Sequence, residues 1–408
     1  MVFKCQEDSF LKEFVGKVVS CEPVKTAEDS KETEYKVILD DTILFPEGGG
    51  QPFDYGTLDG KPVKSVIRVG SEAVHFVEMT EPFQIGQKVK QIVDWPRRMD
   101  HMQQHSGQHL ITALFSREFG FETQSWWLGN ETSYIDLAVK DVTKENMDRI
   151  ERIANELIFE GRAVTVEVTT VEKGLQFQDI RAPRGLPADH VGPVRVVNIE
   201  GVESNMCCGT HVRNLSQLQA IKLLHAEKTK GKVLVHFLVG NRVIKKLGEC
   251  YGREMQMNNI LRGGPSSHID LIEKLQSNQK SKQKAFLQLL KDFAVAEASK
   301  LRSLESKPKF FSLHRRDGIE PDFISTFLRN APDDIFYFMT VGDTTGKGHM
   351  VLKGDEEIIK KISAEFLELL DGKGNGKGKS FQAKVNNLAK INECEKMLID
   401  ALSGPQPA

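Results

Sequence analysis

Two short pairs of histidine and cysteine are the residues best suited to metal chemistry in this chain. His105 and His109 are four residues apart, so on a helix their imidazoles point the same way. Cys207 and His211 flank a Gly-Thr turn and offer a thiolate and a third imidazole. Nitrogen and sulfur donors of this kind suit a tetrahedral zinc ion, so we expect one zinc ion per chain on these four residues.

Length and composition describe a soluble globular protein with several domains. The 408 residues are too many for one ordinary core, and two to four domains are expected. The net charge of −2 gives no argument for a nucleic-acid partner from overall basicity, so such a partner must be argued from local patches. The six cysteines are sparse, as is usual in a reducing compartment, and the N-terminus shows no signal pattern. No apolar stretch reaches the ~18 residues of a membrane span, so we expect the cytoplasm.

The N-terminal part, residues 1–95, is rich in short β-prone runs separated by turns. The candidate strands are residues 14–20, 35–39, 43–45, 64–69, 73–77 and 86–93. Their spacing predicts a small β-barrel or sandwich.

Residues 96–248 mix helices and strands. Pro96 opens the helix that carries the first histidine pair, and residues 144–161 form a second amphipathic helix. Strands are expected at 163–171, 194–199 and 233–239, and the Cys207 loop follows the second of these. This pattern predicts an α+β domain with two metal ligands on a helix and two on a loop.

The C-terminal half continues with a long helix and a last domain. Gly263-Gly264-Pro265 interrupts the chain, and apolar residues then recur at heptad spacing over 272–296. We therefore expect a helical segment over 249–306 and, from a βαββα pattern, an α/β domain over 307–408. The predicted fold is thus multidomain α+β, and the helical segment or the last domain could form a homodimer.

Three motifs in this order resemble the freestanding alanyl-tRNA editing proteins (AlaX type, long form). They are residues 41–51, which end in a Gly-rich run, residues 105–109, and residues 207–211. The family is related to the editing domain of alanyl-tRNA synthetase, and the C-terminal third is similar to the oligomerising, tRNA-contacting tail of that synthetase. The motifs cover roughly residues 10 to 240.

The resemblance implies the same four zinc ligands, His105, His109, Cys207 and His211. Cys208 stands where the family usually has glycine, so either sulfur could bind, although only Cys207 has the family spacing to His211. His101 could also face the metal, or it is a surface or supporting histidine. We interpret His190, in a loop rich in proline and glycine, in the same way.

The implied activity is hydrolysis, in trans, of mischarged tRNA(Ala), chiefly seryl-tRNA(Ala), in the service of translation fidelity. Thr42 and Gln51 are assigned to the catalytic pocket, Thr42 for recognition of serine; the plainer interpretation of Thr42 is a strand residue beside a turn. Gly48, Gly49 and Gly50 permit close backbone approach to the terminal adenosine or the ester, or they only connect two barrel strands.

The role of zinc stays open at this point. An open coordination position would let it activate water, whereas four protein ligands would make it a fixed element that positions the substrate. We favour positioning. No Ser-centred elbow or obvious Cys-His dyad is present, which disfavours a covalent intermediate.

Lys373, Lys377 and Lys379 lie among glycines and could follow the phosphates of tRNA. A solvated loop is the plainer interpretation of this tract, and its similarity to the synthetase tail favours tRNA binding. Two other functions remain compatible with the sequence: a zinc-stabilised, non-catalytic RNA-binding protein, and a zinc esterase that does not depend on tRNA.

Overall fold

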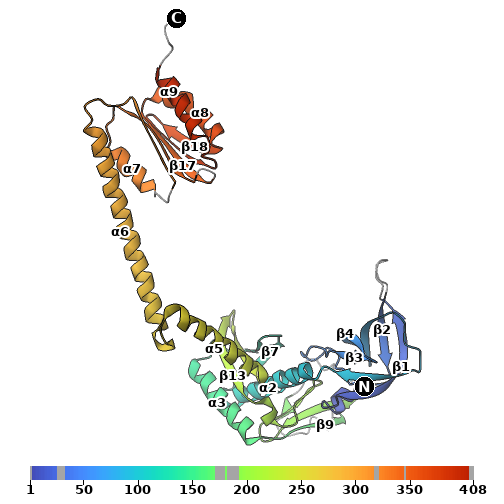
Figure 1. Ribbon diagram of the computed structural model, residues 1–408. Helices are drawn as coiled ribbons and strands as arrows, with labels where there is room; N and C mark the ends of the chain where they lie inside the picture. The colour runs from blue at the N-terminus through green and yellow to red at the C-terminus, as the bar shows by residue number, and fades with distance from the viewer. Residues whose placement is uncertain are drawn as a thin grey trace. The chain divides into compact units, whose positions relative to one another are not determined.

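The structure is a computed structural model, and it describes residues 2–24, 33–170, 180–181, 193–316, 321–343 and 346–403 (Figure 1). His190 lies outside these residues. The chain divides into two compact units, Met1–Met255 and Gln256–Ala408, which are described separately. Among the described residues, no helix has the length and apolarity needed to cross a bilayer.

Six strands close into a barrel in the first unit (Figure 1). The strands are β1 (Glu13–Pro23), β2 (Thr33–Leu39), β3 (Gly56–Leu58), β4 (Lys61–Val69), β5 (Glu72–Met79) and β6 (Lys88–Val93), preceded by the short helix α1 (Lys4–Glu7). They follow the order β1-β2-β5-β4-β3-β6, and β6 pairs with β1 to close the sheet. Strand β6 alternates exposed and buried residues, as expected when one face lines a core. The predicted barrel is confirmed.

The strand predicted at residues 43–45 is wrong, because this segment is a buried loop. Its three backbone N–H groups donate to side chains, namely the amide oxygen of Gln91, the hydroxyl of Thr42 and the carboxylate of Asp54, at 3.0, 3.0 and 2.7 Å. Side-chain acceptors thus replace a partner strand, and the aliphatic side chains fill the barrel core.

Helix α2 (Trp95–Phe119) leads from the barrel into an α+β region (Figure 1). Asp94 is its N-cap and accepts a hydrogen bond from the Arg97 N–H, Pro96 lies in the first turn, and Gly120 ends the helix at φ 65°. The helix start expected at Pro96 is therefore confirmed.

The middle of α2 is buried on all sides although it is rich in polar residues. The Gln104 amide donates to the carbonyl of Val239 and accepts from its N–H, at 2.9 and 3.1 Å. A Cβ at Gly107 would lie 2.5 Å from the Val239 side chain, so glycine is needed for this close approach. These contacts fix the depth and rotation of α2 against the sheet and so place its histidines.

Two four-stranded sheets complete the first unit, in the orders β13-β14-β8-β7 and β10-β12-β11-β9. Their elements are β7 (Thr123–Leu128), β8 (Ser133–Leu137), α3 (Lys144–Glu160), β9 (Val164–Thr170), β10 (Ile180–Arg181), β11 (Pro193–Ile199), β12 (Glu203–Met206), the 3-10 turn η1 (Leu215–Leu218), β13 (Ile221–Thr229) and β14 (Lys232–Val239). Helices α2 and α3 and the first of these sheets share one hydrophobic core.

A mixed five-stranded sheet forms the second unit, with the order β15-β16-β17-β19-β18. Helix α5 (Asn241–Leu261) contains the boundary between the units; then follow η2 (Pro265–Ser267), α6 (His268–Arg302), β15 (Phe310–Arg315), α7 (Pro321–Asn330), β16 (Phe336–Gly342), β17 (Gly348–Lys353), α8 (Glu356–Leu369), β18 (Gly372–Lys377), β19 (Ser380–Val385) and α9 (Ile391–Ser403). Among the described pairings of this five-stranded sheet, that of β15 with β16 is parallel and the other three are antiparallel.

The Lys/Gly tract is an edge strand, β18, and the loop interpretation is wrong for residues 372–377. Glycine is needed here because β19 lies very close: a Cβ at Gly374 would be 2.3 Å from the Gln382 carbonyl oxygen, and one at Gly376 would be 2.5 Å from that of Ser380. The lysines of the tract are exposed.

Candidate metal centre

The four residues expected to bind metal come together in the first unit. Each of His105, His109, Cys207 and His211 has a ligand atom within 4.8 Å of those of the other three. The sulfur of Cys207 lies 3.4 Å from Nε2 of His105 and 3.3 Å from Nε2 of His211. Neighbouring donors of a tetrahedral zinc site are separated by roughly 3.3 to 3.7 Å, given its bond lengths. The N₃S donor set therefore fits a zinc ion in type and in spacing.

Arg195 holds the loop that supplies Cys207. From strand β11, its guanidinium donates to the carbonyl oxygens of Gln6, at 2.9 Å, of Cys207, at 3.0 Å, and of Gly209. The Gln6 amide donates in turn to the Cys208 carbonyl oxygen at 2.7 Å. Sequence analysis missed both residues; the one signal was an arginine among the valines at the start of β11.

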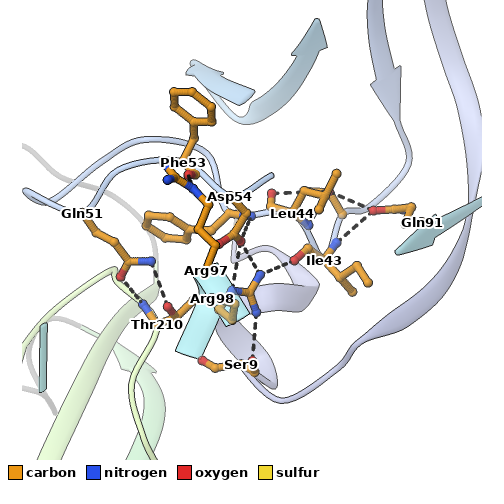
Figure 2. Close-up of polar contacts among 12 residues, drawn as sticks. Ser9, Ile43, Leu44, Gln51, Phe53, Asp54, Gln91, Arg97, Arg98 and Thr210 are labelled. Atoms are coloured by element: carbon orange, nitrogen blue, oxygen red, sulfur yellow. Dashed lines mark hydrogen bonds and ion pairs between the residues drawn. The ribbon is translucent and has the colours of Figure 1, made fainter. Parts of the chain in front are cut away.

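Gln51 orients the imidazole of His105. Its side-chain oxygen accepts from the backbone N–H of Thr210 at 2.9 Å, and its amide donates to the Thr210 hydroxyl at 2.8 Å (Figure 2). The same oxygen lies 3.0 Å from Nδ1 of His105. Because the Thr210 N–H can only donate, this oxygen is an acceptor, and Nδ1 of His105 must carry the proton. Nε2 of His105 is therefore left as a metal donor.

The other two imidazoles also have oxygens beside Nδ1. The Ser106 hydroxyl lies 3.0 Å from Nδ1 of His211, and Glu203 has a carboxylate oxygen 4.0 Å from Nδ1 of His109. A hydrogen bond such as that from Ser106 fixes the ring orientation of a metal-binding histidine, whereas Glu203 lies at ion-pair distance only. Ser106 sits inside the motif at 105–109, so its place in the sequence was visible; Glu203 gave no signal before the fold was known.

Burial sets the protonation of the metal-free cluster. Loss of solvent lowers the pKa of His105 well below its ordinary value, and nearby His109 lowers it further. Burial has the same effect on His211, with His105 adding to it. Burial raises the pKa of Cys207 to about 12, and Cys208 adds to the rise. Without metal, His105 and His211 are neutral and Cys207 is a thiol at neutral pH.

Zinc binding should therefore release about one proton from these three side chains at pH 7.5, because only Cys207 must lose one to become a ligand. Calorimetric titration of metal-free protein with zinc, in buffers of different ionisation enthalpy, measures this number. A value near zero would mean that Cys207 is already a thiolate or does not bind.

Cys208 and His101 lie outside this cluster of the described residues. The sulfur of Cys208 points to the Gly-rich turn, where a Cβ at Gly49 would be only 2.6 Å from it. His101 is buried, and burial, followed by the charge of Arg97, lowers its pKa to about 4. It is a neutral core residue.

The Gly-rich motif is a tight turn packed against the loop that carries Cys207. Gly48 and Gln51 exchange two backbone hydrogen bonds of 3.1 Å, and Gly49 and Gly50 have φ values of 59° and 78°. A Cβ at Gly50 would lie 2.5 Å from Nε1 of Trp126. The motif therefore serves as a barrel turn and as a close backbone approach to this indole.

Comparisons with known proteins agree with this architecture. The family model for the second additional domain of threonyl and alanyl tRNA synthetases matches residues 194–235, and the model for class II (A) tRNA synthetases matches residues 7–97. The chain is 44% identical to the alanyl-tRNA editing protein Aarsd1-B of Xenopus laevis, over 99% of this chain and 98% of that protein. Aarsd1 of Mus musculus is 43% identical, with coverage of 99% and 98%.

This chain belongs to the alanyl-tRNA editing proteins. The putative alanyl-tRNA editing protein alaX of Saccharomyces cerevisiae is 28% identical, over 94% of this chain and 93% of that protein. The resemblance drawn from the three motifs is thereby confirmed.

Thr42 of this editing protein lies in the barrel and is almost fully buried. Its hydroxyl accepts from the Leu44 N–H at 3.0 Å and lies 3.0 Å from the Gln91 side-chain oxygen and 2.9 Å from Nε2 of His75. Burial lowers the pKa of His75 to about 4. Thr42 also borders a cavity of about 190 Å³, lined in part by Asp41.

A buried ion pair fixes the start of α2 to the barrel of the editing protein. Arg98 donates to the carboxylate of Asp54 and to the carbonyl oxygens of Ser9 and Ile43 (Figure 2). Arg98 and Asp54 are both fully buried. Burial opposes the charge of Arg98, but the attraction and hydrogen bond of Asp54 outweigh it and raise the pKa of Arg98. The pair keeps the helix that carries His105 and His109 in register with the Gly-rich turn.

Proposed function

We propose that this chain deacylates mischarged tRNA(Ala) in trans, chiefly seryl-tRNA(Ala), and holds one zinc ion in the cluster of His105, His109, Cys207 and His211. The observation that carries the proposal is this N₃S cluster beneath the Gly-rich turn, in a chain that belongs to the alanyl-tRNA editing proteins. The proposed site of action is the cytoplasm, where charged tRNA is used.

Bound zinc would supply a fixed positive charge that polarises and orients groups of the aminoacyl ester. The four protein donors would complete a tetrahedral shell around the ion, which favours positioning over water activation. The protein's own side chains hold this arrangement: Gln51 fixes the ring of His105, Ser106 that of His211, and Arg195 the Cys207 loop. An aminoacyl ester is reactive, so precise placement and exclusion of wrong substrates carry much of the work.

Trp126 is the residue we propose to bind substrate beside this centre. Its indole N–H is buried, has no hydrogen-bond partner among the described residues, and lies against Gly50. Buried donors are normally satisfied, so an unmet one at a site points to a ligand. The ester or the terminal ribose offers acceptor oxygens for it.

Trp126→Phe should lower kcat/KM for seryl-tRNA(Ala) by about 3- to 10-fold, the worth of one neutral hydrogen bond, because it removes the donor and keeps the ring. Steady-state deacylation measures the effect. Trp127→Phe is the matched control: its side chain is half exposed and pairs with Tyr134 instead. Equal losses in both variants would contradict the role of the Trp126 N–H.

Serine is the proposed target for a physical reason. An alanine pocket rejects an added hydroxyl poorly, so a second site must recognise that hydroxyl. A pocket group that forms a hydrogen bond with the serine hydroxyl has no partner when alanine is bound. This unpaired group disfavours the alanyl ester, so the pocket discriminates serine from alanine. Thr42 is our candidate; its own hydroxyl already has partners, so contact with serine would have to replace one of these hydrogen bonds.

The deciding experiment measures release of serine and alanine from charged tRNA(Ala), with metal stripped and restored, in wild type and Thr42→Val. We expect zinc-dependent release of serine well above that of alanine, and a smaller ratio in the variant. Equal release of both amino acids by wild type would contradict serine specificity. No release at all would favour a non-catalytic RNA-binding protein, and equal hydrolysis of small serine esters with any tRNA present would favour a simple esterase.

Lys373, Lys377 and Lys379 are proposed to bind tRNA phosphates from the edge strand and its turn. Replacement of all three by glutamine should raise KM for seryl-tRNA(Ala) severalfold and leave hydrolysis of a small seryl ester unchanged. Lysines on an edge strand also discourage aggregation through that edge. An unchanged KM would contradict the tRNA contact and leave protection of the edge as their only role.

We also propose a homodimer through α6 or the last domain, which light scattering would test.

A further inference from the structure

A second group of metal-binding side chains lies on the sheet β13-β14-β8-β7. His225 on β13 is directly opposite His236 on β14, and Glu227 follows two residues later on β13. Alternation along a strand puts His225 and Glu227 on one face. This face differs from the one that packs on α2, because Val239, three residues after His236, is the residue that contacts Gly107.

The three side chains already converge. The rings of His225 and His236 are stacked, with centroids 4.4 Å apart and planes 12° apart. Nε2 of His236 lies 3.2 Å from a carboxylate oxygen of Glu227. The three ligand atoms are all within 4.8 Å of one another. Small rotations about side-chain bonds would bring these atoms to metal-binding distance.

Neighbouring rings hold His236 in this orientation. Tyr134 on β8 pairs with His236 and its ring lies 5.5 Å away, and Trp127 on β7 lies 5.7 Å beyond Tyr134. The register of β13 against β14 shifts between Leu223 and His225, and such an irregularity changes the direction in which the His225 side chain leaves the sheet. One ligand is thus half-buried and supported, while His225 and Glu227 are exposed and accessible to an ion.

Most of the positive charge of this hairpin is paired. Three of its four lysines form ion pairs with acids, Lys222–Glu151, Lys228–Asp141 and Lys232–Asp136, and the fourth, Lys230, lies in the turn between the strands. Glu227 contributes the negative charge of the group.

We propose that His225, Glu227 and His236 form a second site for a divalent transition-metal ion of the zinc type. Two imidazoles and one carboxylate favour such an ion over calcium or magnesium, which prefer oxygen donors. Three protein donors leave coordination positions open to water or to an external oxygen ligand such as a phosphate. The site has no sulfur and is exposed, so it binds its ion more weakly than the N₃S cluster would.

The test counts zinc ions bound to the metal-free full-length protein by equilibrium dialysis at buffered, micromolar free zinc. Wild type is expected to bind two equivalents, and His236→Asn one. Glu227→Gln should weaken the second equivalent at least 10-fold, since the amide keeps the shape and removes the charge. His349→Asn, which removes an exposed histidine of the other unit, should still bind two.

Cobalt separates the two sites spectroscopically. A cysteine ligand gives an intense sulfur-to-cobalt charge-transfer band in the absorption spectrum. A second equivalent of cobalt, bound at the site without sulfur, should leave the intensity of that band unchanged. In Cys207→Ala the second equivalent should persist, so loss of the first site does not hide the result. One equivalent in wild type, or a second that survives the His225→Asn/His236→Asn double substitution, would overturn the proposal.

Discussion

Cys207→Ala should abolish tight zinc binding and lower hydrolysis of seryl-tRNA(Ala) by at least about 100-fold. Loss of a residue that only supports a metal ligand already reduces metal affinity or activity by about 10- to 100-fold, and loss of a ligand should exceed this. Cys207 is also the one sulfur donor of the described cluster and lies within 3.4 Å of two imidazole nitrogens, so its removal leaves three nitrogen donors. Zinc content and deacylation rate are measured on the same preparation.

Cys208→Ala is the matched control, one residue away. Its sulfur points to Gly49 and lies outside the cluster, so the variant should keep its zinc and most of its activity. If Cys208→Ala lost its zinc while Cys207→Ala kept it, the assignment of the sulfur ligand would be reversed.

Asp54→Asn should lower the free energy of unfolding of the first unit by about 3–5 kcal/mol, because it leaves the charge of Arg98 buried without a counter-ion. The loss of a negative acceptor also weakens the hydrogen bond from the Phe45 N–H. Urea unfolding followed by tryptophan fluorescence measures the change, and Trp95, Trp126 and Trp127, the three tryptophans of the chain, all lie in this unit.

Glu156→Gln provides the comparison for that measurement. It removes one partner of the exposed pair Arg152–Glu156 on α3, whose side chains are more than half exposed. Exposed pairs of this kind contribute at most a few tenths of a kcal/mol. Similar losses in both variants would show that the buried pair does not fix α2 to the barrel.

Residue spacing predicted the metal cluster because the constraint is local. His105 and His109 share one helix face, and Cys207 and His211 share one short loop, so each pair could be found without knowing the fold. That the two pairs meet was expected from their combined donor set and from the resemblance, because nothing else in the sequence fixes the packing of α2 against the loop. The structure shows how it is fixed: through Gly107, Gln104 and the Arg98–Asp54 pair.

The failures have one cause: groups outside each segment, either side chains or a neighbouring strand, decide its local structure. Residues 43–45 have the composition of a strand, yet their N–H groups are taken by Thr42, Asp54 and Gln91. The glycines of 372–377 suggest a loop, yet β19 lies close enough that only glycine fits. Contacts made outside the segment override its local propensity in both cases. Arg195 and Glu203 escaped prediction for the same reason. The assigned roles of Thr42, Gln51 and the lysines stay predictions.

X-ray absorption at the zinc edge, on wild-type protein loaded with one equivalent of zinc, shows which donors hold the ion. We expect three nitrogen donors at about 2.0–2.1 Å and one sulfur at about 2.3 Å. A shell without sulfur, or with two sulfurs, would contradict it.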